Sequence, residues 1–313
     1  MDPGLPKVVA FKKQGIPGGS LGFKQKLRAF LVLGRISNLP TVWSNCLAGW
    51  LIAGGGLTEF FLTLCASASC FYIGGMYMND ACDAEFDRQF RKERPIPSGI
   101  VSVRLVWGLT VVWFVSGLSL AAFLGRPTLL MSIIMLGFIV PYDLIHKYVK
   151  FSPWIMAVCR LVLYLTAATA GSGWAGDRGG FLGQLVWSSV ALAVYIIGLS
   201  YLARLESSRQ PVLKAWPCLL LGGPILLSVF FNGGSFRITG LVFAAICGVW
   251  IVWCLRNVFR RSAPQVGKTV GGLLAGIVLV DALAIAQTDL LMNGLLVVLF
   301  LSALLLQKVI PAT

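Results

Sequence analysis

The stretch Asn79–Asp87 reads NDACDAEFD and, with the residues that follow it to position 93, holds five of the chain's twelve acidic residues. An α-helix turns about 100° per residue, so Asp80, Asp83 and Asp87 fall within a sector of roughly 60°, whereas Glu85 points away from it. Carboxylates at this spacing repel one another unless a cation lies between them. Two interpretations are open: a solvated acidic face, the commoner case, and a cation-binding site.

The next residues favour the second interpretation. Positions 88–99 read RQFRKERPIPSG, so basic side chains follow the carboxylates, and Pro95 and Pro97 end the helix. Mg²⁺ in proteins typically takes one or two carboxylates together with oxygens of a substrate phosphate. The remaining phosphate oxygens can accept hydrogen bonds from guanidinium and ammonium groups. The sequence therefore predicts a site for Mg²⁺ and a diphosphate.

The same residues carry a resemblance to a known family. The pattern Asn79-Asp80-x-x-Asp83-x-x-x-Asp87, followed by Arg94 and PIPSG, resembles the first signature motif of the UbiA superfamily of intramembrane prenyltransferases. In that family the aspartates hold Mg²⁺ on a prenyl diphosphate, which the asparagine and the basic residues help to orient. The resemblance implies metal-binding and catalytic roles for the three aspartates, and substrate-binding roles for Asn79 and Arg94.

The composition indicates a polytopic membrane protein. Of the 313 residues, 57% are hydrophobic and only 12% are charged, whereas charged residues make up about a quarter of a typical soluble chain. Residues 1–28 are expected to form a basic, partly disordered cytoplasmic tail, and residues 29–309 a single all-α transmembrane domain. Hydrophobic runs near the roughly 20 residues that cross a bilayer predict nine or ten transmembrane helices, and the resemblance implies nine around a central cavity. The runs are 38–54, 57–79, 102–124, 128–144, 152–173, 181–202, 213–231, 237–257, 270–286 and 290–309.

The net charge of +14 reflects membrane orientation. The basic residues are scattered through short loops between the hydrophobic runs, which argues against a nucleic-acid partner. If the runs alternate across the bilayer, 22 Lys and Arg residues lie on the side of the N-terminus and three on the other. The positive-inside rule then places the N-terminus and the acidic loop in the cytoplasm, in an inner or plasma membrane.

Four further residues are candidates. Asn38 and Asn45, at the start of the first run, are either capping and packing residues or part of the Arg/Asn pattern that faces the substrate in the UbiA family, with Asn38 the stronger candidate. Lys147, after the fourth run, either binds a diphosphate oxygen or is only an orientation charge. Arg160 lies inside a hydrophobic run, so it should face a cavity or a partner, for which Asp143 and Asp281 are candidates. The only histidine, His146, is expected to be solvated or interfacial.

The second signature of the family is altered in this chain. Positions 201–209 read YLARLESSR, where most catalysts of the family have a second aspartate-rich element. Glu206 is the only acidic residue there, and Arg204 and Arg209 bring positive charge. Glu206 and Arg209 are expected to bind the substrate. The pattern is similar to an atypical branch, the UbiA-like members of Ebo clusters. Arg204, aided by Arg209, is predicted to stabilise the departing diphosphate in place of a second Mg²⁺.

Two functional hypotheses follow. The first is Mg²⁺-dependent transfer of a prenyl group from a prenyl diphosphate to an aromatic or lipid acceptor within the bilayer. The second is a non-catalytic component that binds or exports a prenyl diphosphate or metabolite, having kept the first site and lost the second. The intact first motif favours the enzyme, and the missing second aspartates favour the binding protein.

Overall fold

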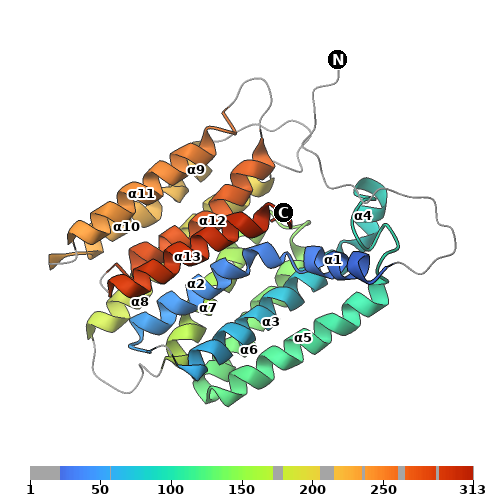
Figure 1. Ribbon diagram of the computed structural model, residues 1–313, viewed down its shortest axis with the longest axis horizontal. Helices are drawn as coiled ribbons and strands as arrows, with labels where there is room; N and C mark the ends of the chain where they lie inside the picture. The colour runs from blue at the N-terminus through green and yellow to red at the C-terminus, as the bar shows by residue number, and fades with distance from the viewer. Residues whose placement is uncertain are drawn as a thin grey trace.

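The computed structural model describes residues 22–56, 58–171, 179–204, 215–234, 237–259, 265–286 and 289–312. Within these ranges all regular structure is helical, which confirms the predicted all-α fold. Figure 1 shows the helices as one elongated bundle, in which most of the long helices run roughly along the same direction.

The helices follow the predicted hydrophobic runs closely. They are α1 (Phe23–Leu33), the 3₁₀ turn η1 (Ile36–Asn38), α2 (Leu39–Ile52), α3 (Glu59–Cys82), α4 (Ala84–Phe90), α5 (Val103–Phe123), α6 (Arg126–Ile145), α7 (Ser152–Ala170), α8 (Gly179–Ala203), α9 (Ala215–Leu221), α10 (Gly223–Phe231), α11 (Arg237–Leu255), α12 (Val266–Ala284) and α13 (Leu290–Gln307).

The number of helices long enough to cross a bilayer differs from the number of runs. Among the described residues, seven helices are both long and apolar enough, namely α3, α5, α6, α7, α8, α11 and α12. The run 213–231 is divided into α9 and α10 at Gly222, because Pro224 lacks the amide hydrogen needed to continue a helix and stands in the first turn of α10. The helices α2 and α13 are shorter than the seven.

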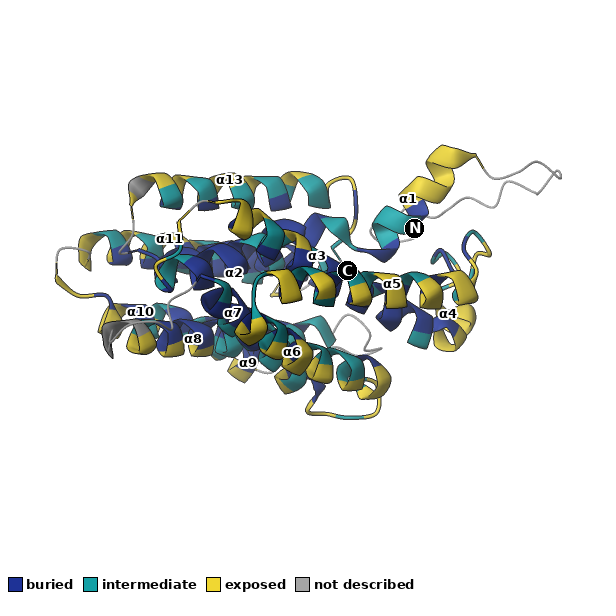
Figure 2. Cartoon of the chain, turned by 90° about the horizontal axis from the view of Figure 1, so that it is seen from below, coloured by how far each residue is buried: buried dark blue, intermediate teal, exposed yellow. Residues whose placement is uncertain are grey.

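Burial divides the bundle into an inner group and an outer group of helices. Nearly every described side chain of α2 and α12 is buried, and α2 packs against α3, α7, α12 and α13. The outer helices α5 and α11 bury only every third or fourth residue and expose apolar side chains along the rest of their surfaces (Figure 2). Water would solvate such surfaces poorly, whereas lipid chains match them. The chain is therefore an integral membrane protein.

One part of the expected N-terminal tail is ordered. Helix α1 begins at Phe23, so residues 23–28, assigned from the sequence to a partly disordered tail, are helical. Ala29 and Leu33 are buried at the end of α1, and the Tyr77 hydroxyl donates to the Phe30 carbonyl oxygen at 3.2 Å. These contacts explain why the helix extends back beyond the predicted boundary. Residues 1–21 of the expected tail lie outside the described residues.

Close packing of α2 on α7 gives a first prediction. A Cβ atom at Gly49 would lie 2.6 Å from the Tyr164 carbonyl oxygen and 2.8 Å from the Ala167 Cβ. Gly49→Ala should therefore force the two helices apart and cost about 1–3 kcal/mol, as overpacking does. The midpoint of thermal unfolding in detergent measures this.

Gly108 in α5 is the matched control, because nothing lies within 4 Å of a Cβ built there. Gly108→Ala should leave the unfolding midpoint unchanged or raise it, since alanine favours a helix by up to about 1 kcal/mol over glycine. Equal effects of the two substitutions would contradict the packing of α2 on α7.

Candidate functional site

The three predicted aspartates lie together where α3 gives way to α4. Asp80 is in the last turn of α3, Asp83 joins the two helices, and Asp87 is in α4. All three are buried, at 7%, 7% and 1% exposure respectively. Glu85 is exposed and pairs with Arg88 at 2.6 Å. The aspartates therefore share the inner side and Glu85 points outward, as the helical spacing predicts, even though the helix is interrupted at Asp83.

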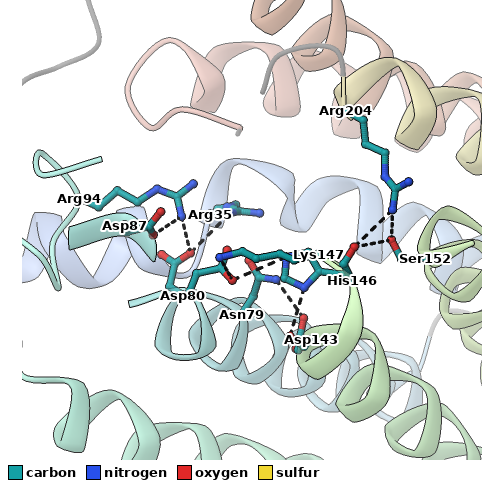
Figure 3. A network of polar contacts seen from close by, with 11 residues as sticks. Arg35, Asn79, Asp80, Asp87, Arg94, Asp143, His146, Lys147, Ser152 and Arg204 are labelled. Carbon is teal, nitrogen blue, oxygen red and sulfur yellow. Dashed lines mark hydrogen bonds and ion pairs between the residues drawn. The ribbon is translucent and has the colours of Figure 1, made fainter. Parts of the chain in front are cut away.

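Arg94 neutralises two of these carboxylates. A series of turns after α4, including Gly99 at φ 78°, folds residues 91–102 back over the end of α3. There Arg94 Nη1 lies 2.8 Å from Asp87 Oδ2 and 3.3 Å from Asp80 Oδ1 (Figure 3). Burial acts to lower the pKa of the Arg94 guanidinium, but the two carboxylates outweigh it and raise that pKa. Arg94 therefore lies directly at the aspartates, and its role in substrate binding stays a prediction.

Arg35 is a second cation at Asp80, and it was not among the predicted site residues. Its Nη2 lies 3.5 Å from Asp80 Oδ1. Its backbone has φ 42° and ψ 48°, the left-handed region that residues other than glycine rarely adopt. Among the described residues it is the only such non-glycine position. Backbone strain of this kind concentrates at functional sites. The sequence offered one separate signal for Arg35, namely its position three residues before Asn38 in the Arg/Asn pattern.

Asp83 is paired from the opposite side by the loop after α6. Lys147 Nζ lies 2.7 Å from Asp83 Oδ1 and His146 Nε2 lies 3.7 Å from the same atom. Burial acts to raise the pKa of Asp83, but the basic side chains of His146 and Lys147 outweigh it and hold that pKa below its ordinary value. His146 lies in the loop just after α6 and is partly exposed, and its ring has a neighbour that the sequence did not predict, the buried carboxylate of Asp83.

Asn79 is joined to a fourth carboxylate that the sequence analysis did not assign to this site. Its Nδ2 donates to Asp143 Oδ1 at 3.2 Å. Asp143 is only 3% exposed, and within the described part of the chain its Oδ2 accepts no hydrogen bond. Figure 3 shows Asp143 below Asn79, on the side away from Arg94. Only the tertiary contact between α3 and α6 brings the two residues together, since they are 64 positions apart in the sequence.

One carboxylate oxygen of this site is free to bind a metal. In the described residues, no three His, Cys, Asp or Glu side chains are gathered in an arrangement that would hold a metal. The aspartates are paired with cations instead, while Asp87 Oδ1 is buried without a hydrogen-bond partner in that part of the chain. Such an oxygen is available as a hard ligand, which suits Mg²⁺.

Arg204 binds the loop that follows α6. Its guanidinium donates to the carbonyl oxygens of Val149 at 2.9 Å and Lys150 at 3.0 Å, and also to the Ser152 hydroxyl and the His146 carbonyl. Figure 3 shows Arg204 joined to Ser152 and His146, well away from Asp80. The loop carbonyls, left without partners where α6 ends, attract the guanidinium. The role of Arg204 at a departing diphosphate stays a prediction. Glu206 and Arg209 lie outside the described residues.

Asn38 lies one turn beyond Arg35, at the end of η1. Its Nδ2 donates to the Ala312 carbonyl oxygen at 3.0 Å, and the neighbouring Ser37 hydroxyl contacts the Pro311 carbonyl oxygen at 3.5 Å. The structure thus joins Asn38 to the segment after α13, and none of its hydrogen bonds in the described chain reaches the aspartates. Its role in substrate binding stays a prediction.

Comparison with known proteins identifies relatives of this arrangement. A sequence model described as the UbiA prenyltransferase family matches residues 39–270. Digeranylgeranylglyceryl phosphate synthase from Methanoculleus marisnigri is 34% identical over 106 residues, which is 34% of this chain and 38% of that protein. The enzyme of the same name from Sulfolobus acidocaldarius is 24% identical over 182 residues, 58% of this chain and 64% of that protein. The chain thus spans less than two thirds of the length of these relatives.

A solved structure shares the fold. The apo structure of a UbiA homologue from Aeropyrum pernix K1 superposes with a TM-score of 0.62 at 19% sequence identity, covering 79% of this chain and 97% of that one. At this identity the likeness concerns the arrangement of the helices alone.

The pairing of Arg94 gives a prediction for stability. Arg94→Gln removes the cation shared by Asp80 and Asp87, which leaves the buried Asp87 without its ion pair and Asp80 with Arg35 alone. The loss should be about 1.5–3 kcal/mol, as for hydrogen bonds to charged groups, and it should appear as a lower unfolding midpoint near neutral pH.

Arg88→Gln is the control for this prediction. Its partner Glu85 is exposed, so the pair is worth less than about 1 kcal/mol. If the two variants unfold at the same temperature, Arg94 does not carry the charge balance of the site.

Proposed function

Since this chain belongs to the UbiA prenyltransferase family, we propose that it transfers a prenyl group from a prenyl diphosphate to an acceptor within the membrane, with Mg²⁺ as cofactor. The observation that carries the proposal is the group of three buried aspartates, each paired with a basic side chain, at the family's first motif. A metal ion can take the place of the basic side chains beside such buried carboxylates, so the group is suited to binding a metal ion together with a diphosphate.

The charges of the site support this proposal. Asp80, Asp83 and Asp87 face three permanent cations in the structure, Arg35, Arg94 and Lys147. The charges of these three aspartates are therefore balanced before any substrate enters. A diphosphate can join such a buried site only if further positive charge comes with it, and Mg²⁺ held by the aspartates would supply that charge and stabilise the departing diphosphate.

The basic residues then have a defined task. When the aspartates bind the metal, Arg94, Arg35 and Lys147 are free to donate hydrogen bonds to diphosphate oxygens, with Asn79 as a neutral donor beside them. Arg94 and Arg35 can each hold two oxygens side by side, whereas Lys147 acts as a point charge. The side chains that neutralise the site at rest would thus bind the substrate.

The acceptor is proposed to be a hydrophobic or aromatic molecule that reaches the site from the bilayer. The relatives are named as synthases of a digeranylgeranylglyceryl phosphate, which favours a lipid acceptor carrying a phosphate group. We place the N-terminus and the site on the cytoplasmic side, because 22 Lys and Arg residues lie on that side of the predicted topology and three on the other. Residues 29–309 are proposed to form the single transmembrane domain.

Arg204 is proposed to act through the loop that it binds. The loop between α6 and α7 carries Lys147, and its backbone carbonyls converge on the Arg204 guanidinium. Holding this loop in place keeps Lys147 at Asp83. In this proposal Arg204 is a positioning residue in place of the predicted contact with the diphosphate, and Glu206 and Arg209 keep their predicted substrate-binding roles.

Removal of one carboxylate tests the metal site. Asp83→Asn should weaken Mg²⁺-dependent binding of a fluorescent prenyl-diphosphate analogue at least tenfold, because it removes a hard oxygen ligand and a negative charge. Titrations with Mg²⁺ and with EDTA measure the metal-dependent part. Glu85→Gln, on the outward side of α4, should change this affinity less than twofold, and equal losses in both variants would show that the inner carboxylates do not bind the metal.

Substitution of Arg204 separates the functional hypotheses. Arg204→Lys cannot reproduce four hydrogen bonds from one planar group, so diphosphate binding and single-turnover transfer should fall together, by about three- to tenfold. A much larger loss of transfer than of binding would indicate direct contact with the departing diphosphate. Arg256→Lys, at the exposed end of α11, is the control and should be silent. Tight binding with no transfer to any acceptor would favour the non-catalytic hypothesis.

A further inference from the structure

A second polar cluster lies inside the bundle, apart from the aspartates of the first motif. It is built from α2, α7 and α12 and contains a carboxylate and an arginine, Asp281 and Arg160. From its geometry we propose that Arg160 binds the anionic group, a phosphate or a carboxylate, of the acceptor. This inference rests on the proposed function, because it assigns the second substrate of the same reaction.

Asp281 is fully satisfied by neutral donors. It is 0% exposed, and its Oδ1 accepts a hydrogen bond from the Tyr164 hydroxyl at 2.6 Å. Its Oδ2 accepts from the Ser44 hydroxyl at 2.6 Å and from Asn45 Nδ2 at 2.7 Å. The carboxylate thus has partners on both oxygens and has no need of a direct contact with a cation.

Arg160 is fixed from one side only. Its Nη1 donates to Asn45 Oδ1 at 2.6 Å and to the Thr41 carbonyl oxygen at 3.2 Å, and its Nη2 donates to Thr41 Oγ1 at 3.2 Å. These bonds use three of the five N–H groups that a guanidinium carries. Because Thr41 engages both terminal nitrogens, the remaining donors are Nε and one hydrogen of Nη2. Nε and Nη2 lie on one edge of the planar guanidinium, and this edge can hold a carboxylate or a phosphate with two parallel hydrogen bonds, in the geometry called a fork.

The charge of Arg160 has no directly paired carboxylate. Within the described chain no Asp or Glu oxygen forms an ion pair with it, and Asn45 stands between it and Asp281. An arginine at the centre of a membrane helix costs roughly 2.5–3.5 kcal/mol and normally marks a ligand path or a partner. Arg160 is only half buried, whereas Thr41 and Asn45 behind it are fully buried. Arg160 therefore keeps accessible surface, whereas the groups that hold it do not.

The position of Arg160 suits an acceptor. It lies eight residues into α7 from Ser152, which is roughly 12 Å along the helix axis from the loop that carries Lys147. On the neighbouring chain segment, Arg35 lies beside Asp80 just before η1 and α2. Thr41 and Asn45, which bind Arg160, follow within α2. An anion held at Arg160 would lie deeper in the bundle than a diphosphate held at the aspartates. The two negative groups stay apart, and the nucleophilic atom of the acceptor can lie between them.

Binding of small anions to the full-length protein in detergent tests this inference. The probes are glycerol phosphate and benzoate, with glycerol and benzyl alcohol as their uncharged counterparts, all titrated in EDTA so that metal-dependent diphosphate binding is absent. At least one anion should bind while its uncharged counterpart does not, and the preferred anion separates phosphate from carboxylate recognition. Arg160→Lys keeps the charge but loses the fork, so it should weaken that binding at least tenfold. The control Arg126→Lys, at an exposed helix start, should leave the affinity unchanged.

Chemical modification provides a test that needs no variant. Phenylglyoxal modifies accessible arginines, and peptide mass spectrometry reports each site. The bound anion should protect Arg160 at least fivefold and leave Arg256 unprotected. No protection of Arg160, or equal binding by wild type and Arg160→Lys, would overturn the inference.

The two proposals fail in different ways. If wild type binds no prenyl diphosphate with Mg²⁺ yet its anion binding depends on Arg160, the proposed function fails and the anion site stands. If Mg²⁺-dependent diphosphate binding is intact in Arg160→Lys and acceptor binding is also unchanged, the proposed function stands and Arg160 only links α7 to α2.

Discussion

Neutralisation of buried carboxylates at the end of α3 is the constraint on which the rest of the site depends. A helix C-terminus carries partial negative charge, so aspartates there are unfavourable even before burial is considered. Burial adds a desolvation cost that paired positive charges must offset. The chain meets this requirement with cations from three separate segments: Arg35 after α1, Arg94 after α4 and Lys147 after α6. The electrostatics of one site thereby fix the relative positions of three loops.

Helix α2 connects this site to the second polar cluster. The turn that precedes it carries Arg35 and Asn38, and its buried face carries Thr41, Ser44 and Asn45. A helix inside a membrane bundle can bury polar groups only where each finds a partner. Here those partners come from α7 and α12, which lie beside α2 at the centre of the bundle. The polar contacts and the close approach at Gly49 act together, so α2 has little freedom to shift without breaking both.

The sequence predicted what depends on local spacing. The inward direction of Asp80, Asp83 and Asp87, the outward direction of Glu85 and the positions of the apolar helices all follow from helical periodicity and composition, and the structure agrees with them. The pairing of Arg94 with the aspartates fits the motif. Arg35, Asp143 and His146 were missed as site residues because each reaches the site through a contact between helices distant in sequence. Periodicity contains no information about such contacts.

Arg160 and Arg204 are residues that the sequence did single out, but whose contacts it could not predict. Arg160 stood out as a charge inside a hydrophobic run, and Arg204 as a basic residue where most catalysts of the family carry aspartates. The sequence did not identify the hydrogen-bond partners of either residue. In the structure, neutral oxygens surround both guanidinium groups. A carbonyl or amide oxygen orients a guanidinium without cancelling its charge, so Arg160 keeps its positive charge inside a membrane helix. All four acceptors of Arg204 belong to residues 146–152, which suits Arg204 to holding that loop. Arg160 lies inside the bundle against α2 with Nε and one Nη2 hydrogen unused, which suits it to holding an anion.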